Sequence, residues 1–162
     1  MNLVNQDSGY DHYLNDPIDS DDWGTAHLLF MIEEAARGWH RCEYTPPRIC
    51  VGDLSWGNKD NQEFGGYFSP HVCHQNGLEV DIRYVRNDGA EDPLDISTSD
   101  SLFFDEYATG SLINFLIRSA DVDLIYIDFN HTTIRREGIT YHAKGHSDHF
   151  HVRISDPDGT NN

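Results

Sequence analysis

Residues 78–85 read LEVDIRYV, and their side chains alternate between apolar and polar as far as Tyr84. Successive side chains of a strand point to opposite faces, so Glu79, Asp81 and Arg83 would share one face and the apolar residues the other. The stretch 149–154, HFHVRI, repeats this alternation and places two histidines on its polar face. The two stretches therefore predict a pair of strands with a core face and a face that carries potential metal ligands.

Two helices are expected around these strands. Apolar side chains follow helical spacing from about residue 22 to residue 37, with Ser20 or Asp21 as the cap and Gly38 as the stop. A second amphipathic helix is expected over residues 107–120.

The rest of the chain predicts two more strands and long loops. The apolar stretches 48–54 and 123–129 are expected to be strands, and residues 138–141 a short extended piece. Stretches rich in Gly, Asn and Asp, at 56–69 and 88–100, predict loops. The resulting order of helices and strands indicates an α+β fold, a single domain with a mostly antiparallel sheet, flanking helices and long loops.

The chain of 162 residues is long enough for one ordinary domain. Residues 1–21 are expected to form a loop-rich arm, residues 22–155 the folded domain and residues 156–162 a flexible tail. With 38% hydrophobic and 12% aromatic residues, the composition is typical of a globular protein rather than a disordered one. The sequence leaves the oligomeric state open.

The formal charge of −17 argues against nucleic acid or an anionic membrane as a partner, because both would be repelled. No apolar run approaches the roughly 20 residues that span a bilayer, so membrane insertion is not expected. Residues 1–9 are polar and lack the basic and apolar parts of a signal peptide. A substrate outside the cytoplasm would then require another route, such as phage-mediated lysis, a dedicated secretion system or removal of a leader.

Three cysteines occur, at positions 42, 50 and 73, without the Cys-x-x-Cys spacing of a thiolate zinc finger. Cys42 and Cys50 could close a small loop in an oxidising compartment, which the sequence leaves open. A nucleophilic role for Cys73 is disfavoured, since the neighbouring His74 is better used as a metal ligand and no oxyanion motif is visible.

Six of the ten histidines fall into two groups, at 71–74 and 142–151. His149 and His151 are two residues apart and would leave the same face of a strand, while His74 precedes a bend at Gly77. Two imidazoles and the Asp81 carboxylate form a set that suits zinc and leaves one position open for water. His149, beside ligand His151, is then placed to take the proton of that water or to stabilise an oxyanion.

These motifs resemble those of a known family of zinc peptidases. The spacing His-x-x-Gly-x-x-x-Asp followed by His-x-His is similar to the signature of the group that includes lysostaphin-type enzymes, D-Ala-D-Ala dipeptidases and hedgehog-like domains. Within it, the chain more closely resembles the penicillin-insensitive murein endopeptidases. The matching stretches are VGDLS at 51–55, the glycines at 65–66, HVCHQNGLEVDI at 71–82 and HSDHFHVR at 146–153.

The resemblance covers roughly residues 22–155 and implies His74, Asp81 and His151 as the ligands of one Zn²⁺ per chain. It implies His149 as general base or transition-state stabiliser, and His71 and His146 as further active-site histidines. The implied reaction is hydrolysis of peptide bonds in bacterial peptidoglycan, so the protein would act on the cell wall. Glu79 departs from the family, which usually has Asp or a small residue there, and this puts the substrate contacts at that position in doubt.

Two other functions remain compatible with the sequence. A hedgehog-like, zinc-stabilised module would bind cell wall without turnover, although such a module has no need for the base that His149 offers. A metal-dependent hydrolase of a different small amide is the third possibility.

Overall fold

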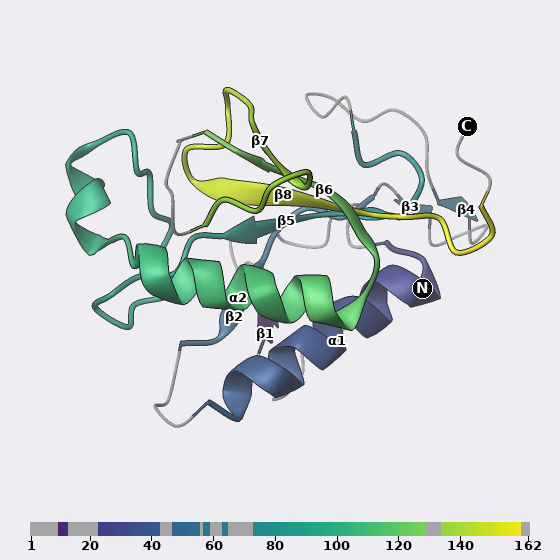
Figure 1. The fold of residues 1–162 in the computed structure, drawn as a ribbon, viewed down its shortest axis with the longest axis horizontal. Coiled ribbons are helices and arrows are strands. Elements are labelled where there is room, and N and C mark those ends of the chain that lie inside the picture. Colours follow the sequence, from purple (N-terminus) through teal and green to yellow (C-terminus); the bar gives the residue numbers. More distant parts are fainter. Residues whose placement is uncertain are drawn as a thin grey trace.

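The computed structural model describes residues 10–12, 23–42, 47–55, 57–58, 63–64, 73–128 and 134–159. These residues form an α+β fold in which a six-stranded sheet is covered by helices on one side (Figure 1). The strands, in spatial order, are β1 (Tyr10–His12), β2 (Ile49–Val51), β5 (Glu79–Arg83), β8 (His149–Ile154), β6 (Val122–Ile127) and β7 (Thr140–His142). The remaining elements are α1 (Ala26–His40), α2 (Glu106–Ser119), the 3₁₀ helix η1 (Ser99–Phe103) and the small hairpin β3 (Gly57–Asn58) with β4 (Glu63–Phe64).

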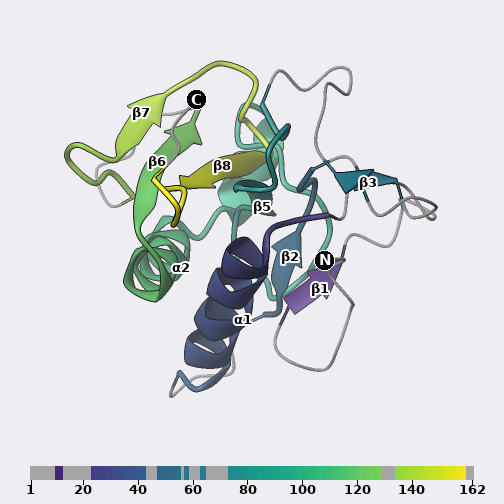
Figure 2. The same ribbon diagram turned by 90° about the vertical axis from the view of Figure 1, so that its right-hand side faces the viewer.

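The sheet is mostly antiparallel, as the sequence predicts. Its three central pairings, β2–β5, β5–β8 and β8–β6, are antiparallel, whereas the outer pairings β1–β2 and β6–β7 are parallel. Figure 2 shows the strands succeeding one another from β7 to β1 across the molecule. The C-terminal strand β8 therefore lies in the interior of the sheet, between two strands that precede it in the sequence.

Helices α1 and α2 pack against each other and cover the same face of the sheet (Figures 1 and 2). The core between helices and sheet includes Trp39 of α1, Leu112 of α2, and Val80, Ile82 and Phe150 of the central strands, all fully or almost fully buried. The apolar faces predicted for residues 78–85 and 149–154 are thus the core faces. The polar faces of β5 and β8 lie on the side of the sheet away from the helices.

Helix α1 begins and ends later than the sequence predicts. Its N-cap is Thr25, whose hydroxyl accepts a hydrogen bond from the backbone N–H of Leu28 at 3.2 Å. The expected caps, Ser20 and Asp21, lie outside the described residues. The expected stop, Gly38, lies inside the helix, which continues to His40. A Cβ at this position would be only 2.7 Å from Cδ1 of Phe115 in α2. Gly38 is therefore a contact point between helices rather than a helix end.

Two other predicted regions contain regular structure. Within the segment 1–21, predicted to be a loop-rich arm, Tyr10–His12 forms the edge strand β1 and pairs in parallel with β2. The segment 88–100, predicted to be a loop, ends in the first residues of η1, which has Thr98 as its cap. In the segment 156–162, Asp156 accepts from the backbone N–H groups of Asp158 and Gly159 in a turn.

None of the three cysteines, all within the described residues, forms a disulfide. The thiol of Cys50 instead lies 3.6 Å from the backbone carbonyl oxygen of Glu91. No helix of the described residues combines the length and the apolar character that crossing a bilayer requires.

Replacing Gly38 with alanine tests the helix contact. A mid-helix Gly→Ala change ordinarily stabilises a helix by about 1 kcal/mol. Here we expect the free energy of unfolding to fall by about 1–3 kcal/mol, because the added methyl group overlaps the Phe115 ring. Denaturant unfolding measures the effect. The same change in a Phe115→Leu background should recover most of the loss, and an equal loss in both backgrounds would contradict the contact.

Candidate metal centre

The centre of the polar sheet face is set by the pairing of β5 with β8. In this antiparallel register Asp81 lies directly opposite His151, and the oxygen Oδ1 of Asp81 is 2.9 Å from Nδ1 of His151. Both residues are buried, with only 6% and 3% of their surface exposed. The strand pair thus brings together a carboxylate and an imidazole that are 70 positions apart in the sequence.

His74 reaches the same carboxylate from the loop before β5. Its backbone is in the left-handed region, with φ of 63°, and its N–H donates to a carboxylate oxygen of Glu79. The bend at Gly77 is confirmed by a φ of 72°. The buried ring places Nε2 at 3.3 Å from Oδ1 of Asp81. His74, Asp81 and His151 therefore converge, as the sequence predicts.

The ring of His74 is held in one tautomer. Its Nδ1 contacts the backbone carbonyl oxygen of Leu54, which can only accept a hydrogen bond. Nδ1 therefore carries the proton, and the lone pair of the neutral ring is on Nε2, which faces Asp81. A backbone carbonyl behind a histidine is a common arrangement for orienting a metal ligand.

The donor set and its spacing fit a divalent metal ion. One ligand atom from each of the three residues can be chosen so that all lie within 4.8 Å of one another. Tetrahedral ligands about 2.0–2.1 Å from a zinc ion are roughly 3.3 Å apart. The distance of 3.3 Å between His74 and Asp81 matches this value, and the 2.9 Å between Asp81 and His151 is slightly shorter. The protein thus contains a buried group of histidines and carboxylate that could hold a metal ion.

The electrostatics keep the Asp81 carboxylate ionised. Burial by itself would raise the pKa of Asp81, but hydrogen bonds from His151 and His74 and the nearby charge of His149 together lower it. For His74, burial lowers the pKa, and the interaction with Asp81 outweighs this and raises it. A metal cation would therefore meet an anionic carboxylate in a buried, polar pocket.

His149 lies beside this group without being needed as a ligand. Its Nδ1 is 2.8 Å from Oδ1 of Asp148, so the carboxylate orients the ring, and its Nε2 is 3.5 Å from Oδ2 of Asp81. Asp148 is itself held by Arg83 at 2.6 Å. Burial lowers the pKa of His149, but the hydrogen bond to Asp148 and the charge of Asp81 outweigh burial and raise it. The bond with His149 also lowers the pKa of Asp148 to about 2.

His146 is also at the site, as predicted. Its ring centroid is 5.0 Å from that of His149 and 6.1 Å from that of His151, and its Nδ1 is 3.1 Å from the carbonyl oxygen of Ala143. Burial, with the charge of His149, lowers the pKa of His146 and keeps the ring neutral. His71 lies outside the described residues, so the role predicted for it remains a prediction.

Three neighbours of the site have no clear signal in the sequence. Tyr126 of β6 stacks on His151, with ring centroids 5.7 Å apart, because it is the cross-strand partner of His151. Asp148 is an acid next to a histidine, and its hydrogen bond depends on the turn before β8. Leu54 contacts His74 through its backbone carbonyl, so the type of its side chain gives no indication of the contact. By contrast, Glu79 and Arg83, two residues before and after Asp81, could be placed on the site face from the alternation.

No protein-family model matches the chain, and no curated protein matches it.

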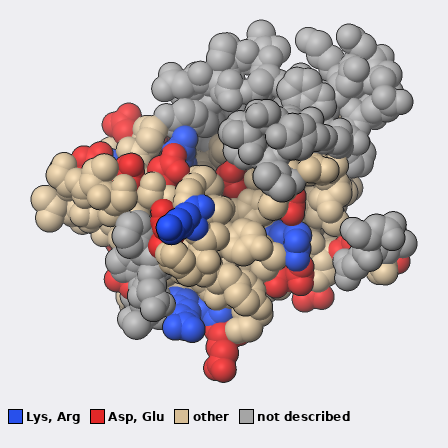
Figure 3. All heavy atoms as spheres, turned by 90° about the horizontal axis from the view of Figure 1, so that it is seen from above, with Lys and Arg blue, Asp and Glu red and all other residues tan. Residues whose placement is uncertain are grey.

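The face of the molecule away from α1 and α2 carries charges of both signs (Figure 3). Seen from the side away from α1 and α2, Lys and Arg side chains stand among Asp and Glu side chains (Figure 3). The net charge of −17 therefore does not make the described part of this face uniformly negative. A peptide approaching it would meet mixed polarity.

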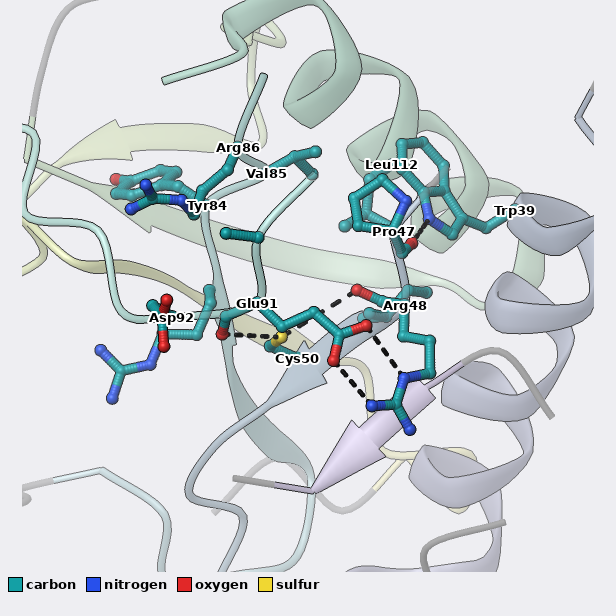
Figure 4. A pocket seen from close by; sticks show the side chains of 13 residues that line it. Trp39, Pro47, Arg48, Cys50, Tyr84, Val85, Arg86, Glu91, Asp92 and Leu112 are labelled. Atoms are coloured by element: carbon teal, nitrogen blue, oxygen red, sulfur yellow. Dashed lines mark hydrogen bonds and ion pairs between the residues drawn. The ribbon is translucent and has the colours of Figure 1, made fainter. Parts of the chain in front are cut away.

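A separate pocket lies beside β2 and is not lined by any of the histidines (Figure 4). At its rim the guanidinium of Arg48 binds the carboxylate of Glu91 with distances of 2.9 and 2.7 Å. Arg86, also in the lining, binds Asp88 at 2.6 Å. Since these arginines are already paired, the pocket is a weaker candidate for an anionic ligand than the histidine group is for a metal.

The effects of Asp81→Asn and Asp148→Asn on metal affinity distinguish a metal ligand from a residue that only orients a neighbouring histidine. Asp81→Asn should weaken zinc binding by more than about 100-fold, beyond what the loss of an outer contact usually costs. Asp148→Asn should weaken it by less than about tenfold, because Asp148 contacts His149 rather than the metal. Competition with a chromophoric chelator measures both. Equal losses would contradict the assignment of Asp81 as a ligand.

Proposed function

We propose that the protein is a zinc-dependent peptidase that hydrolyses peptide bonds of bacterial peptidoglycan. The observation that carries this proposal is the group of His74, Asp81 and His151 with an oriented fourth histidine, His149, directly beside it. Metal binding alone would need only the first three. A base held by its own carboxylate favours catalysis over a purely structural metal site.

The donor set supports zinc with an open coordination position. Two neutral imidazoles and one carboxylate leave a net positive centre, and zinc bound in this way supplies a Lewis acid that polarises a carbonyl and acidifies water. The described ligands number three, which matches catalytic rather than closed structural zinc sites.

The proposed roles of the surrounding residues follow from their contacts. Asp148 fixes the proton of His149 on Nδ1, so Nε2 is available to accept a proton from the attacking water and later to pass it to the leaving amine. Arg83 holds Asp148 in place. His146 is half-buried and neutral, and its Nδ1–H faces the carbonyl oxygen of Ala143. The lone pair on Nε2 is therefore placed to accept a hydrogen bond, for example from a substrate N–H group.

The substrate class rests on the resemblance of residues 51–55, 71–82 and 146–153 to murein endopeptidases. The ligands of the proposed site lie on the sheet face opposite to the one that α1 and α2 cover. The same resemblance implies that the protein acts on the cell wall.

Release of soluble fragments from purified sacculi tests the activity. We expect release that stops when a chelator removes the metal and returns when zinc is added back, with mass analysis identifying the bond. A protein that binds sacculi and zinc but releases nothing from several wall types would instead be a binding module.

The role of His149 is tested separately from metal binding. His149→Ala should keep its zinc content and lower kcat by about 10²–10⁴-fold, because a general acid–base contributes this much. His151→Ala should lose both zinc and activity. Full turnover by the His149→Ala variant would disprove the role of His149 and leave the metal site intact.

A further inference from the structure

The second ring nitrogen of His151 is left without a hydrogen bond. Among the described residues, Nε2 of His151 is the buried side-chain polar atom that has no hydrogen-bond partner. Only 3% of the surface of His151 is exposed, so water cannot readily form a hydrogen bond with this atom. Such an orphaned group costs about 1–3 kcal/mol, and it therefore points to something that the fold is built to place there.

Two side chains that could bind a metal, Glu79 and Cys73, lie close to His151. The oxygen Oε1 of Glu79 is 3.9 Å from Nε2, beyond hydrogen-bond distance, while the other oxygen of the same carboxylate is held by the backbone N–H of His74. Cys73 is half-buried, and its Sγ, a Glu79 oxygen and a His151 nitrogen lie within 4.8 Å of one another. A sulfur, an oxygen and a nitrogen that could bind a metal thus lie close together beside the His151 ring.

We propose that Cys73, Glu79 and Nε2 of His151 form a second metal position, distinct from the His74–Asp81–His151 group, that takes a thiophilic divalent cation such as Cd²⁺. The proposal does not depend on the peptidase function.

The chemistry of the donors distinguishes the two positions. A thiolate is a soft ligand and selects soft metals, whereas imidazoles with a carboxylate suit zinc and harder ions. Binding replaces the S–H bond of Cys73 by a bond from sulfur to the metal and releases the proton to solvent. Thiolate and carboxylate together neutralise a divalent cation, which favours its burial. The first group, with a single carboxylate, retains a net positive charge.

His151 decides which of the two positions is filled. A neutral imidazole has one lone pair and one N–H. If Nδ1 carries the proton, it donates to Asp81 at 2.9 Å and Nε2 is free to bind a metal between Glu79 and Cys73. If Nε2 carries the proton, Nδ1 is the ligand in the first group. With a neutral ring the two positions exclude each other, so a thiophilic cation would convert Asp81 from ligand to hydrogen-bond acceptor.

Cadmium titration of the metal-free protein tests the second position, with thiolate-to-cadmium charge-transfer absorption as the signal. The wild-type protein should show the signal with saturation at one equivalent. Cys73→Ser should abolish it, and the matched control Cys50→Ser should leave it unchanged. A signal that persists in Cys73→Ser, or that is absent from the wild type, would overturn the proposal.

The two positions are separated by a second pair of variants. His74→Asn, chosen because asparagine tolerates the left-handed backbone, should keep the cadmium signal while losing the first group. Cys73→Ser should retain zinc binding through His74, Asp81 and His151. Loss of the cadmium signal in a folded His74→Asn variant, checked by circular dichroism, would show that there is one position rather than two. Because no substrate is involved, these outcomes are independent of whether the protein is a peptidase.

Discussion

The antiparallel pairing of β5 with β8 is the constraint on which the rest of the structure depends. One register places Ile82 against Phe150 in the core and Asp81 against His151 on the opposite face. A slip of one residue would exchange the two faces of one strand and place apolar side chains where the ligands stand. Burial of the apolar face therefore fixes the geometry of the polar face, and the free energy that stabilises the core also holds the carboxylate beside the imidazole.

His74, His149 and His151 differ in what contacts the ring nitrogen that points away from the proposed metal position. His74 is held by a backbone carbonyl and His149 by the Asp148 carboxylate, so each presents a defined nitrogen. His151 has an acceptor at Nδ1 and no partner at Nε2. The surroundings of His74 and His149 thus determine which nitrogen each ring presents, whereas His151 can bind a metal through either nitrogen. This difference allows one histidine to belong to two sets of ligands.

Sequence reasoning predicts the parts of this structure that depend on local periodicity. The alternation at 78–85 and 149–154 places both central strands and their faces correctly, and the predicted ligands converge. Gly38 is assigned wrongly as a helix stop. Its role is a tertiary contact with Phe115, a residue far away in the sequence that a local pattern cannot reveal. The three-residue strand β1 is too short to give a periodic signal. The contacts of Leu54 and Asp148 depend on loop paths that no side-chain pattern specifies.

The place of β8 in the sheet has a consequence for how the protein is made. This strand follows both β5 and β6 in the sequence, yet it lies between them in the sheet and carries both His149 and His151. A nascent chain that has not yet released residues 149–154 from the ribosome can hold neither a joined sheet nor a complete set of ligands. Assembly of the His74–Asp81–His151 group must therefore wait until residues 149–154 can pair with β5 and β6.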